Sequence, residues 1–267
     1  MIQKKFERLI AYLRIVESGV LAYSGGLDST FLLYAMKESG IKALAVVGKS
    51  ATMPNCDLIS ALEMIEIIGI RHRIIETSEL SDLRFTSNPP NRCFYCKNAL
   101  FGSIAVIAKE EGFDNIFDGS TIDDLDDYRP GLKAKELHNV ISPLIIAQFN
   151  KDEIRIMSKE KGLKTWDKPA SPCLSSRLPY GSAITTEALT MIETAEEALK
   201  ELGFGKNLRV RHHGKIARIE LDKVDLKRAM DDNYREQIVK KFRDIGFLYV
   251  TIDIEGYISG KLNREIK

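Results

Sequence analysis

Residues 19–29 read GVLAYSGGLDS, an apolar stretch that runs directly into a glycine-containing turn. Gly19–Tyr23 has the composition of a short buried strand, and Thr30–Lys37 continues the chain as an apolar helix. Glycine carries no Cβ, so backbone N–H groups in such a turn can close on phosphate oxygens. The N-terminus of the following helix favours an anion at the same place. The stretch therefore predicts a phosphate-binding loop between a strand and a helix.

Further strands and helices alternate on the C-terminal side of this loop. The apolar patterns predict strands at Ala43–Val47, Ile70–Ile75 and Asn115–Phe117, and helices at Asp57–Ile68 and Asn98–Glu111. Alternation of this kind indicates an α/β fold with a doubly wound parallel sheet. Because ligands bind at the carboxyl ends of such strands, we expect the loop at 24–29, the chain after Val47 and the residues 118–124 to lie along one edge.

The pattern changes near residue 180. Residues 168–181 read KPASPCLSSRLPYG, and their prolines and glycine predict irregular chain. Beyond them the sequence predicts a helix, a hairpin, a second helix and a final strand, at Thr186–Leu202, Leu208–His212 with Ile216–Leu221, Asn233–Asp244 and Phe247–Ile254. We therefore expect two domains: 1–180, which holds the ATP site and the cysteines, and 181–267, a small α+β domain for substrate binding or oligomerisation.

Composition narrows the class of protein. The 39 basic and 38 acidic residues give a net charge of +1, spread evenly over both predicted domains, so we expect no nucleic-acid substrate. The charged, amphipathic N-terminus differs from a signal peptide, and no stretch approaches 18 apolar residues. The sequence thus predicts a cytoplasmic protein with no membrane contact, whose cysteines serve as thiols, metal ligands or catalysts.

The cysteines form an unusual set. Cys93 and Cys96 make a CxxC, Cys173 lies between the prolines of the linker, and Cys56 precedes the helix predicted at Asp57–Ile68. A CxxC can share a metal or form a redox pair. Three cysteines suit a [4Fe–4S] cluster with one open iron. A structural zinc site with Cys56 or a histidine as fourth ligand, and simple buried thiols, are the alternatives.

The Ser-Gly-Gly-x-Asp-Ser motif after a first strand resembles the PP-loop ATP pyrophosphatases, also described as adenine nucleotide alpha hydrolase-like. It is neither a Walker A loop nor a G-x-G-x-x-G motif. The resemblance implies cleavage of ATP to AMP and pyrophosphate. Bare phosphate would repel Asp28, so its presence in the loop indicates Mg²⁺ or the helix N-terminus as its partner. The ATP-binding residues that the resemblance implies are Ser24, Gly25, Gly26, Asp28, Ser29, Met53 in the adenine loop, Gly119 and Asp123.

Around Cys173 the resemblance becomes narrower. Residues 171–177 (SPCLSSR), 180–181 (YG) and 209–212 (RVRH) look like the LarE sulfur transferases, and the likeness covers both predicted domains. Such a likeness implies adenylation of a pyridinium-3,5-dicarboxylate mononucleotide and its conversion to a thiocarboxylate for the nickel-pincer nucleotide. Catalytic roles are implied for Cys173 and Asp28, and binding of the substrate phosphate for Arg209 and Arg211. Arg177 can also bind an anion, and Glu197 and Glu220 are candidates for the polar lining of the site. Surface salt bridges are the alternative for each of these side chains.

The resemblance allows two sulfur sources. In one form of the family, a cysteine at the Cys173 position gives up its own sulfur and becomes dehydroalanine. In the other, three cysteines hold a [4Fe–4S] cluster that carries an extra sulfide. Cys93, Cys96 and Cys173 match the second form, which implies an external sulfide source or sulfur-donor protein. Relatives assemble as homo-oligomers, and we expect the same here.

Three other functions share parts of this pattern. A tRNA thiolase has the same loop and cysteine logic but needs a basic RNA-binding surface. An ammonia-using adenylating ligase, similar to NAD synthetase, needs no cysteines. A nucleotide-sensing module with a zinc site would bind ATP without turning it over.

Overall fold

The structure of the protein is a computed structural model, which describes residues 2–125, 131–205 and 207–265. The chain folds into two compact units. The first comprises the chain up to Glu79 together with Asn91–Ser171. The second comprises Leu80–Pro90 and the chain from Pro172 onward, so the chain passes between the units three times. The division of 1–180 and 181–267 into functional domains stays a prediction.

A parallel sheet forms the centre of the first unit. Its strands are β1 (Ser18–Ala22), β2 (Lys42–Lys49), β3 (His72–Glu76) and β4 (Ile116–Phe117), in the order β3-β2-β1-β4. Every strand pair is parallel, and Leu21 of β1 lies opposite Ala45 of β2 and Phe117 of β4. The predicted doubly wound sheet is confirmed.

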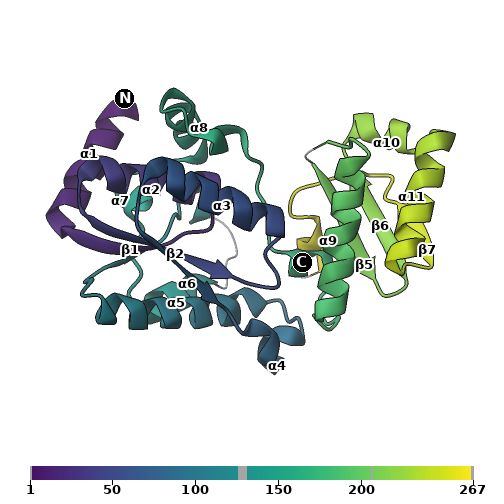
Figure 1. The fold of residues 1–267 in the computed structure, drawn as a ribbon, viewed down its shortest axis with the longest axis horizontal. Coiled ribbons are helices and arrows are strands. Elements are labelled where there is room, and N and C mark those ends of the chain that lie inside the picture. Colours follow the sequence, from purple (N-terminus) through teal and green to yellow (C-terminus); the bar gives the residue numbers. More distant parts are fainter. Residues whose placement is uncertain (1, 126–130, 206, 266–267) are drawn as a thin grey trace. The chain divides into compact units, whose positions relative to one another are not determined.

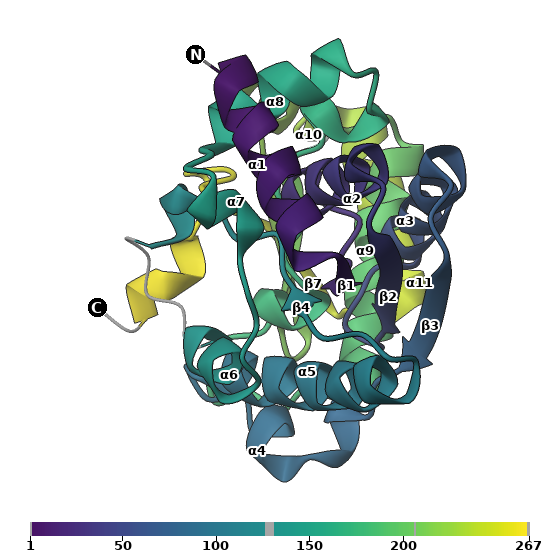
Figure 2. The same cartoon turned by 90° about the vertical axis from the view of Figure 1, so that its left-hand side faces the viewer.

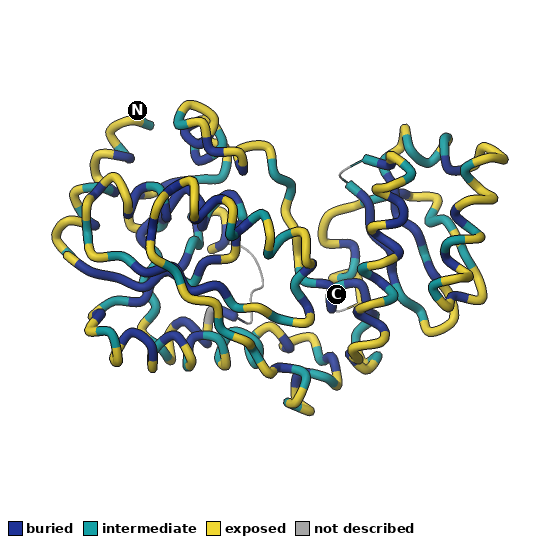
Figure 3. The backbone as a smooth tube through the Cα atoms, in the orientation of Figure 1, coloured by how far each residue is buried: buried dark blue, intermediate teal, exposed yellow. Residues whose placement is uncertain are grey.

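Helices cover both faces of this sheet (Figures 1 and 2). Because side chains alternate along a strand, Leu21 and Val47 enter one apolar core while Val20 and Val46 enter the other. The helices that contribute to the first core are α1 (Ile2–Val16), α2 (Leu27–Ser39), α3 (Asn55–Ile68), α7 (Pro143–Ile146) and α8 (Lys151–Glu160). Those that contribute to the second are α5 (Arg92–Glu110) and α6 (Gly131–Leu137). Figure 3 shows β1 and the middle of β2 as the buried centre of this unit, whereas the edge strand β3 is partly exposed. Short 3₁₀ helices complete it: η1 (Glu79–Ser81, which ends in the second unit), η2 (Ile122–Asp124) and η3 (Lys164–Asp167).

The second unit is built on a smaller sheet. Strands β5 (Leu208–His213) and β6 (Ile216–Leu221) form an antiparallel hairpin, and β7 (Tyr249–Ile252) pairs with β6 in parallel. The other elements are α4 (Leu83–Thr86), η4 (Leu174–Arg177), α9 (Thr186–Glu201), α10 (Lys223–Ala229), α11 (Asp232–Ile245) and η5 (Lys261–Glu265). Apolar side chains of α9 and α11, among them Leu199 and Phe242, pack against the sheet as one core. This architecture confirms the predicted small α+β unit.

Residues 80–90 are held in the second unit by main-chain hydrogen bonds. The N–H of Gly181 donates to the carbonyl of Asn88 at 2.9 Å, and the N–H of Ile184 donates to that of Thr86 at 2.8 Å. The fully buried Asn88 side chain donates to the carbonyl of Pro179 at 2.7 Å. These bonds make the early segment a structural part of the unit that the C-terminal chain forms.

None of the helices in the described ranges is long and apolar enough to cross a membrane.

Candidate active site

The phosphate-binding loop lies where β1 ends and α2 begins, as the sequence predicts. Gly25 has φ +68°, a backbone conformation that favours glycine, and a Cβ there would lie 2.4 Å from the Cβ of Ala61. Gly26 is the N-cap residue of α2, and the hydroxyls of Ser24 and Ser29 lie 3.0 Å apart. The loop thus places two hydroxyls and a helix N-terminus together, which is an arrangement suited to phosphate oxygens.

Asp28 is a half-buried residue in the first turn of α2. Burial raises its pKa to about 6, Lys151 opposes this shift and Asp124 adds to it. Its Oδ1 atom is buried and accepts no hydrogen bond from the residues that the structure describes. Mg²⁺ is usually held by one or two carboxylates together with substrate phosphates. An orphaned carboxylate oxygen beside a phosphate-binding loop fits this requirement.

The turn after β4 packs directly against the loop. A Cβ on Gly119 would lie 2.8 Å from the backbone N and 2.9 Å from the Cα of Ser29, so only glycine permits this approach. Lys135 of α6, which we did not single out from the sequence, holds the turn in place. Its buried ammonium lies 3.0 Å from Asp118 Oδ2 and donates to the hydroxyl of Ser120 at 3.0 Å.

Asp123 lies on the exposed side of the same turn. Its Oδ2 accepts from the backbone N–H of Lys151 at 2.8 Å, at the start of α8. The neighbouring Asp124 is buried and lies 3.0 Å from the ammonium of Lys151. Asp123 therefore caps a helix in this structure, and its role toward ATP stays a prediction.

The predicted adenine loop follows β2. Met53 is half-buried there, and Thr52 is buried beside it. Glu79, which sequence reasoning missed, accepts a hydrogen bond from the hydroxyl of Ser50. Its Oε2 is buried and has no partner among the described residues. A single carboxylate in a loop belongs to no repeating pattern, so the sequence alone contains no feature that would identify Glu79 as a buried residue.

The CxxC lies inside a helix. Helix α5 begins at Arg92, so Cys93 and Cys96 stand one turn apart on its first turns, Cys93 exposed and Cys96 half-buried. The N-terminus of a helix stabilises thiolates. Two thiols in this position fit neighbouring ligands of a metal or cluster.

Cys173 opens η4 in the second unit. Its Sγ lies 2.9 Å from the hydroxyl of Ser175. The guanidinium of Arg177 donates to the carbonyls of Pro172 and Cys173 and, with two bonds of 2.9 Å, to both carboxylate oxygens of Glu196. Arg177 is 1% exposed, so the ion pair lies in the interior. Arg177 thus fixes the backbone at the thiol, and its predicted contact with substrate stays a prediction.

Arg211 and Glu220 form a second interior pair. The guanidinium of Arg211 donates to the two carboxylate oxygens of Glu220 at 3.0 and 2.8 Å, and to the carbonyl of Ser176 at 2.7 Å. Arg209, on the same strand, is also buried, and burial followed by the charge of Arg177 lowers its pKa. A bound anion would relieve that repulsion.

Glu196 takes an interior position, whereas the sequence analysis singled out its neighbour Glu197. Glu197 is exposed on α9, whereas Glu196 is buried and pairs with Arg177. Helical spacing could have found this, because Glu196 lies on the face of the buried Ile192 and Leu199.

The structure therefore assembles two groups of predicted residues. Ser24–Ser29, Gly119 and Asp123 gather in the first unit, and Cys173, Arg177, Arg209, Arg211 and Glu220 in the second. Cys93 and Cys96 belong to the first unit and Cys173 to the second, so their joint site stays a prediction. Among the described residues, no three His, Cys, Asp or Glu side chains form a ready metal site.

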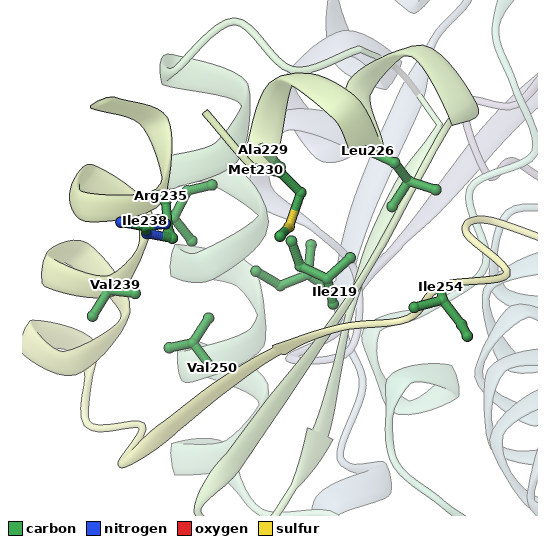
Figure 4. Close-up of a pocket in the computed structure, with 10 residues that line it drawn as sticks. Ile219, Leu226, Ala229, Met230, Arg235, Ile238, Val239, Val250 and Ile254 are labelled. Atoms are coloured by element: carbon green, nitrogen blue, oxygen red, sulfur yellow. The ribbon is translucent and has the colours of Figure 1, made fainter. Parts of the chain in front are cut away.

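An apolar groove of about 600 Å³ opens in the second unit (Figure 4). Side chains of β6, α10, α11 and β7 line it, including Ile219, Met230 and Val250. Arg235 is the charged residue of this lining, and it pairs with Asp232 at 2.8 Å. The lining offers no thiol or carboxylate, so the groove supplies neither a sulfur nucleophile nor a metal ligand.

Comparison with known proteins supports the sulfur-transfer reading. No family model matches the chain. The chain is 40% identical to an uncharacterised protein of Synechocystis over 99% of its length and 98% of the relative. It is 24% identical to the tRNA-specific 2-thiouridylase MnmA of Desulforamulus reducens, over 57% of this chain and 53% of that one. In fold it resembles NMN synthetase from Francisella tularensis, with a TM-score of 0.53, 17% identity and coverage of 64% and 76%.

A further relative carries a functional name. The pyridinium-3,5-bisthiocarboxylic acid mononucleotide synthase of Lactiplantibacillus plantarum is 34% identical over 257 residues, which are 96% of this chain and 92% of the relative. The chain therefore belongs to the family of this synthase, the LarE-type ATP-dependent sulfurtransferases of the PP-loop superfamily.

Proposed function

We propose that the chain adenylates a carboxylate of a pyridinium dicarboxylate mononucleotide and replaces one of its oxygens with sulfur, for a nickel-pincer nucleotide. The observation that carries this proposal is the extent of the match to the synthase of Lactiplantibacillus plantarum. It spans 96% of the chain and so includes both the phosphate-binding loop and the Cys173 segment. The balanced charge of +1 favours a small nucleotide over tRNA as the sulfur acceptor.

Adenylation solves the leaving-group problem of the reaction. A carboxylate oxygen attacks the α-phosphorus of ATP, pyrophosphate leaves, and the substrate oxygen becomes part of AMP, which is a good leaving group. The backbone and hydroxyls of Ser24–Ser29 stabilise the phosphate charge in this step. Asp28 would hold Mg²⁺, which neutralises charge on the phosphates.

Cys173 can then act as the nucleophile. Its thiolate attacks the carbonyl carbon, a C–S bond forms and the bond to the AMP oxygen breaks. Loss of the Cα proton and cleavage of the Cβ–Sγ bond would release the thiocarboxylate and leave dehydroalanine. Arg177 donates hydrogen bonds to the carbonyls of Pro172 and Cys173, which fixes the backbone on both sides of the thiol and so restricts the positions that the thiol can reach.

The second sulfur source uses all three predicted ligands. Cys93, Cys96 and Cys173 would hold a [4Fe–4S] cluster, which supplies a sulfide in place of the cysteine sulfur. Such an enzyme turns over repeatedly and depends on an external sulfide source. In both cases we propose Arg209, with Arg211, as the ligand of the substrate phosphate, since an anion there offsets the charge of the buried guanidiniums. Homo-oligomeric assembly belongs to the same proposal.

The test is a single-turnover reaction with anaerobically purified protein. We expect AMP, pyrophosphate and thiocarboxylate from ATP, Mg²⁺ and the dicarboxylate mononucleotide. Cys173→Ser should still release pyrophosphate but form no thiocarboxylate. If Cys173 is the donor, its peptide loses about 34 Da, the mass of H₂S, and Cys93→Ala stays active. If a cluster is the donor, iron and labile sulfide copurify and Cys93→Ala is inactive. Thiolated tRNA, or amidation by ammonia, would refute the proposal.

A further inference from the structure

Three polar side chains tie the linker before Cys173 to the first unit. The ammonium of Lys168 lies 3.0 Å from Asp57 Oδ1, and the hydroxyl of Ser171 donates to Asp57 Oδ2 at 2.6 Å. Asp57 lies in the first turn of α3, where a carboxylate is favoured by the helix N-terminus. We call Asp57, Lys168 and Ser171 the linker anchor. Pro172 alone separates it from Cys173 in the sequence.

The linker anchor also contacts the phosphate-binding loop. Lys168 donates to the carbonyl of Gly25 at 3.1 Å. Gly25 in turn lies against Ala61 of α3, the helix that carries Asp57. Loop, helix and linker are therefore joined at one point, and all of these residues belong to the first unit.

The charges at this point respond to a bound phosphate. The side chains of Lys168 and Asp57 are 19% and 15% exposed, so solvent screens their charges only in part. A triphosphate on the loop brings several negative charges beside a lysine that already touches the loop. The anchored linker keeps that lysine in place, whereas a released linker removes it. The anchored state must therefore bind ATP more tightly than the released state.

We propose that Lys168 is a positioning residue that couples the occupancy of the phosphate-binding loop to the order of the chain leading to Cys173. Nucleotide binding stabilises the linker anchor, and Asp57 and Ser171 transmit this to the backbone next to the thiol. The proposal rests on the proposed function in taking residues 24–29 as the ATP site. By linkage, the factor by which nucleotide favours the anchored linker equals the factor by which the anchor strengthens nucleotide binding.

Hydrogen exchange tests this coupling without any sulfur chemistry. In the parent protein, a non-hydrolysable ATP analogue with Mg²⁺ should slow amide exchange in peptides spanning residues 168–176 by about tenfold, as expected for a few charged hydrogen bonds. Lys168→Met and Ser171→Ala should still bind the analogue at raised concentration but lose this slowing. Their Kd values should rise by a similar factor. Lys168→Arg, which can keep both contacts, should restore most of the effect.

Lys37 supplies a matched control. It donates to the carbonyl of Gly69 at 2.8 Å, and Gly69, like Gly25, has a positive φ. Lys37→Met should leave both exchange and affinity unchanged. Slowing that persists in saturated Lys168→Met would overturn the coupling while leaving the ATP site intact. A parent protein that binds no nucleotide would instead refute the proposed function itself.

Discussion

Removing one partner of the Arg177–Glu196 pair should unfold the second unit more readily. The two side chains are 1% and 6% exposed and share two bonds of 2.9 Å. Arg177→Met leaves Glu196 as an interior carboxylate that retains the N–H of Val210 as a donor at 3.1 Å. It also removes the donor to the carbonyls of Pro172 and Cys173. Breaking a buried pair in this way costs about 3–5 kcal/mol of unfolding free energy.

The double variant separates charge burial from packing. Arg177→Met with Glu196→Leu removes both charges together, and an apolar pair of similar volume is often close to neutral. Because the two carbonyls and the N–H of Val210 still lose partners, we expect the double variant to cost about 1–3 kcal/mol. It should thus be more stable than Arg177→Met alone, with a coupling energy of several kcal/mol.

Amide exchange of β5 and β6 peptides in a urea series reports on the second unit. Trp166, the single tryptophan of the chain, lies in the first unit and serves as the control by its fluorescence. Losses below about 1 kcal/mol in Arg177→Met, or a double variant as unstable as the sum of the two single ones, would refute the reasoning.

Three further predictions concern the loop, its carboxylate and the small sheet. Gly119→Ala should weaken Mg²⁺–ATP binding by at least about tenfold in calorimetry, because its Cβ would meet the Ser29 backbone, whereas Gly102→Ala inside α5 should not. Asp28→Asn should abolish this binding yet stabilise the nucleotide-free first unit at pH 7.5. Folding raises the pKa of Asp28 from 3.8 to about 6, so the ionised carboxylate destabilises the folded unit at high pH. The asparagine should therefore raise the unfolding free energy by about 3 kcal/mol at pH 7.5 and by nothing below pH 4. An unchanged urea midpoint at pH 7.5 would contradict this prediction. Burial lowers the pKa of His212 and His213, so the unfolded chain binds more protons below pH 6.5 and the second unit loses stability as pH falls. His213→Gln should flatten that loss in urea midpoints measured between pH 7.5 and 5.5.

The sequence revealed the parts of the fold that local patterns encode. An apolar strand before the glycines at 25 and 26 located β1 and α2, and alternation placed the hairpin at 208–221 to within one residue. The capping box at Asn150 and Glu153, which marks the start of α8, is likewise a pattern of residues close together in the chain. These features depend on neighbours in the chain, which the sequence displays directly.

Features set by distant partners could not be found in this way. The sequence predicts the CxxC just before a helix that begins at Asn98. In the structure, α5 begins at Arg92, directly after Pro89, Pro90 and the N-cap residue Asn91, so the CxxC lies inside the helix. The interior partners of Arg177 and Arg211 lie 19 and 9 residues away, so the sequence presented these arginines as anion ligands. Helix α10 has only seven residues, about two turns, which is too short for its apolar periodicity to be recognised in the sequence.

The excursion of residues 80–90 into the second unit has a consequence for synthesis on the ribosome. This segment emerges early, but its partners Pro179, Gly181 and Ile184 are translated about ninety residues later. At about 5–20 residues per second, the segment waits roughly 5–20 s without its hydrogen-bond acceptors and donors. In a nascent chain this segment therefore stays without its partners until about two thirds of the 267 residues have been translated. A fragment of residues 172–267 alone would lack residues 80–90 of its unit. Fusing residues 80–90 to the N-terminus of this fragment would restore them.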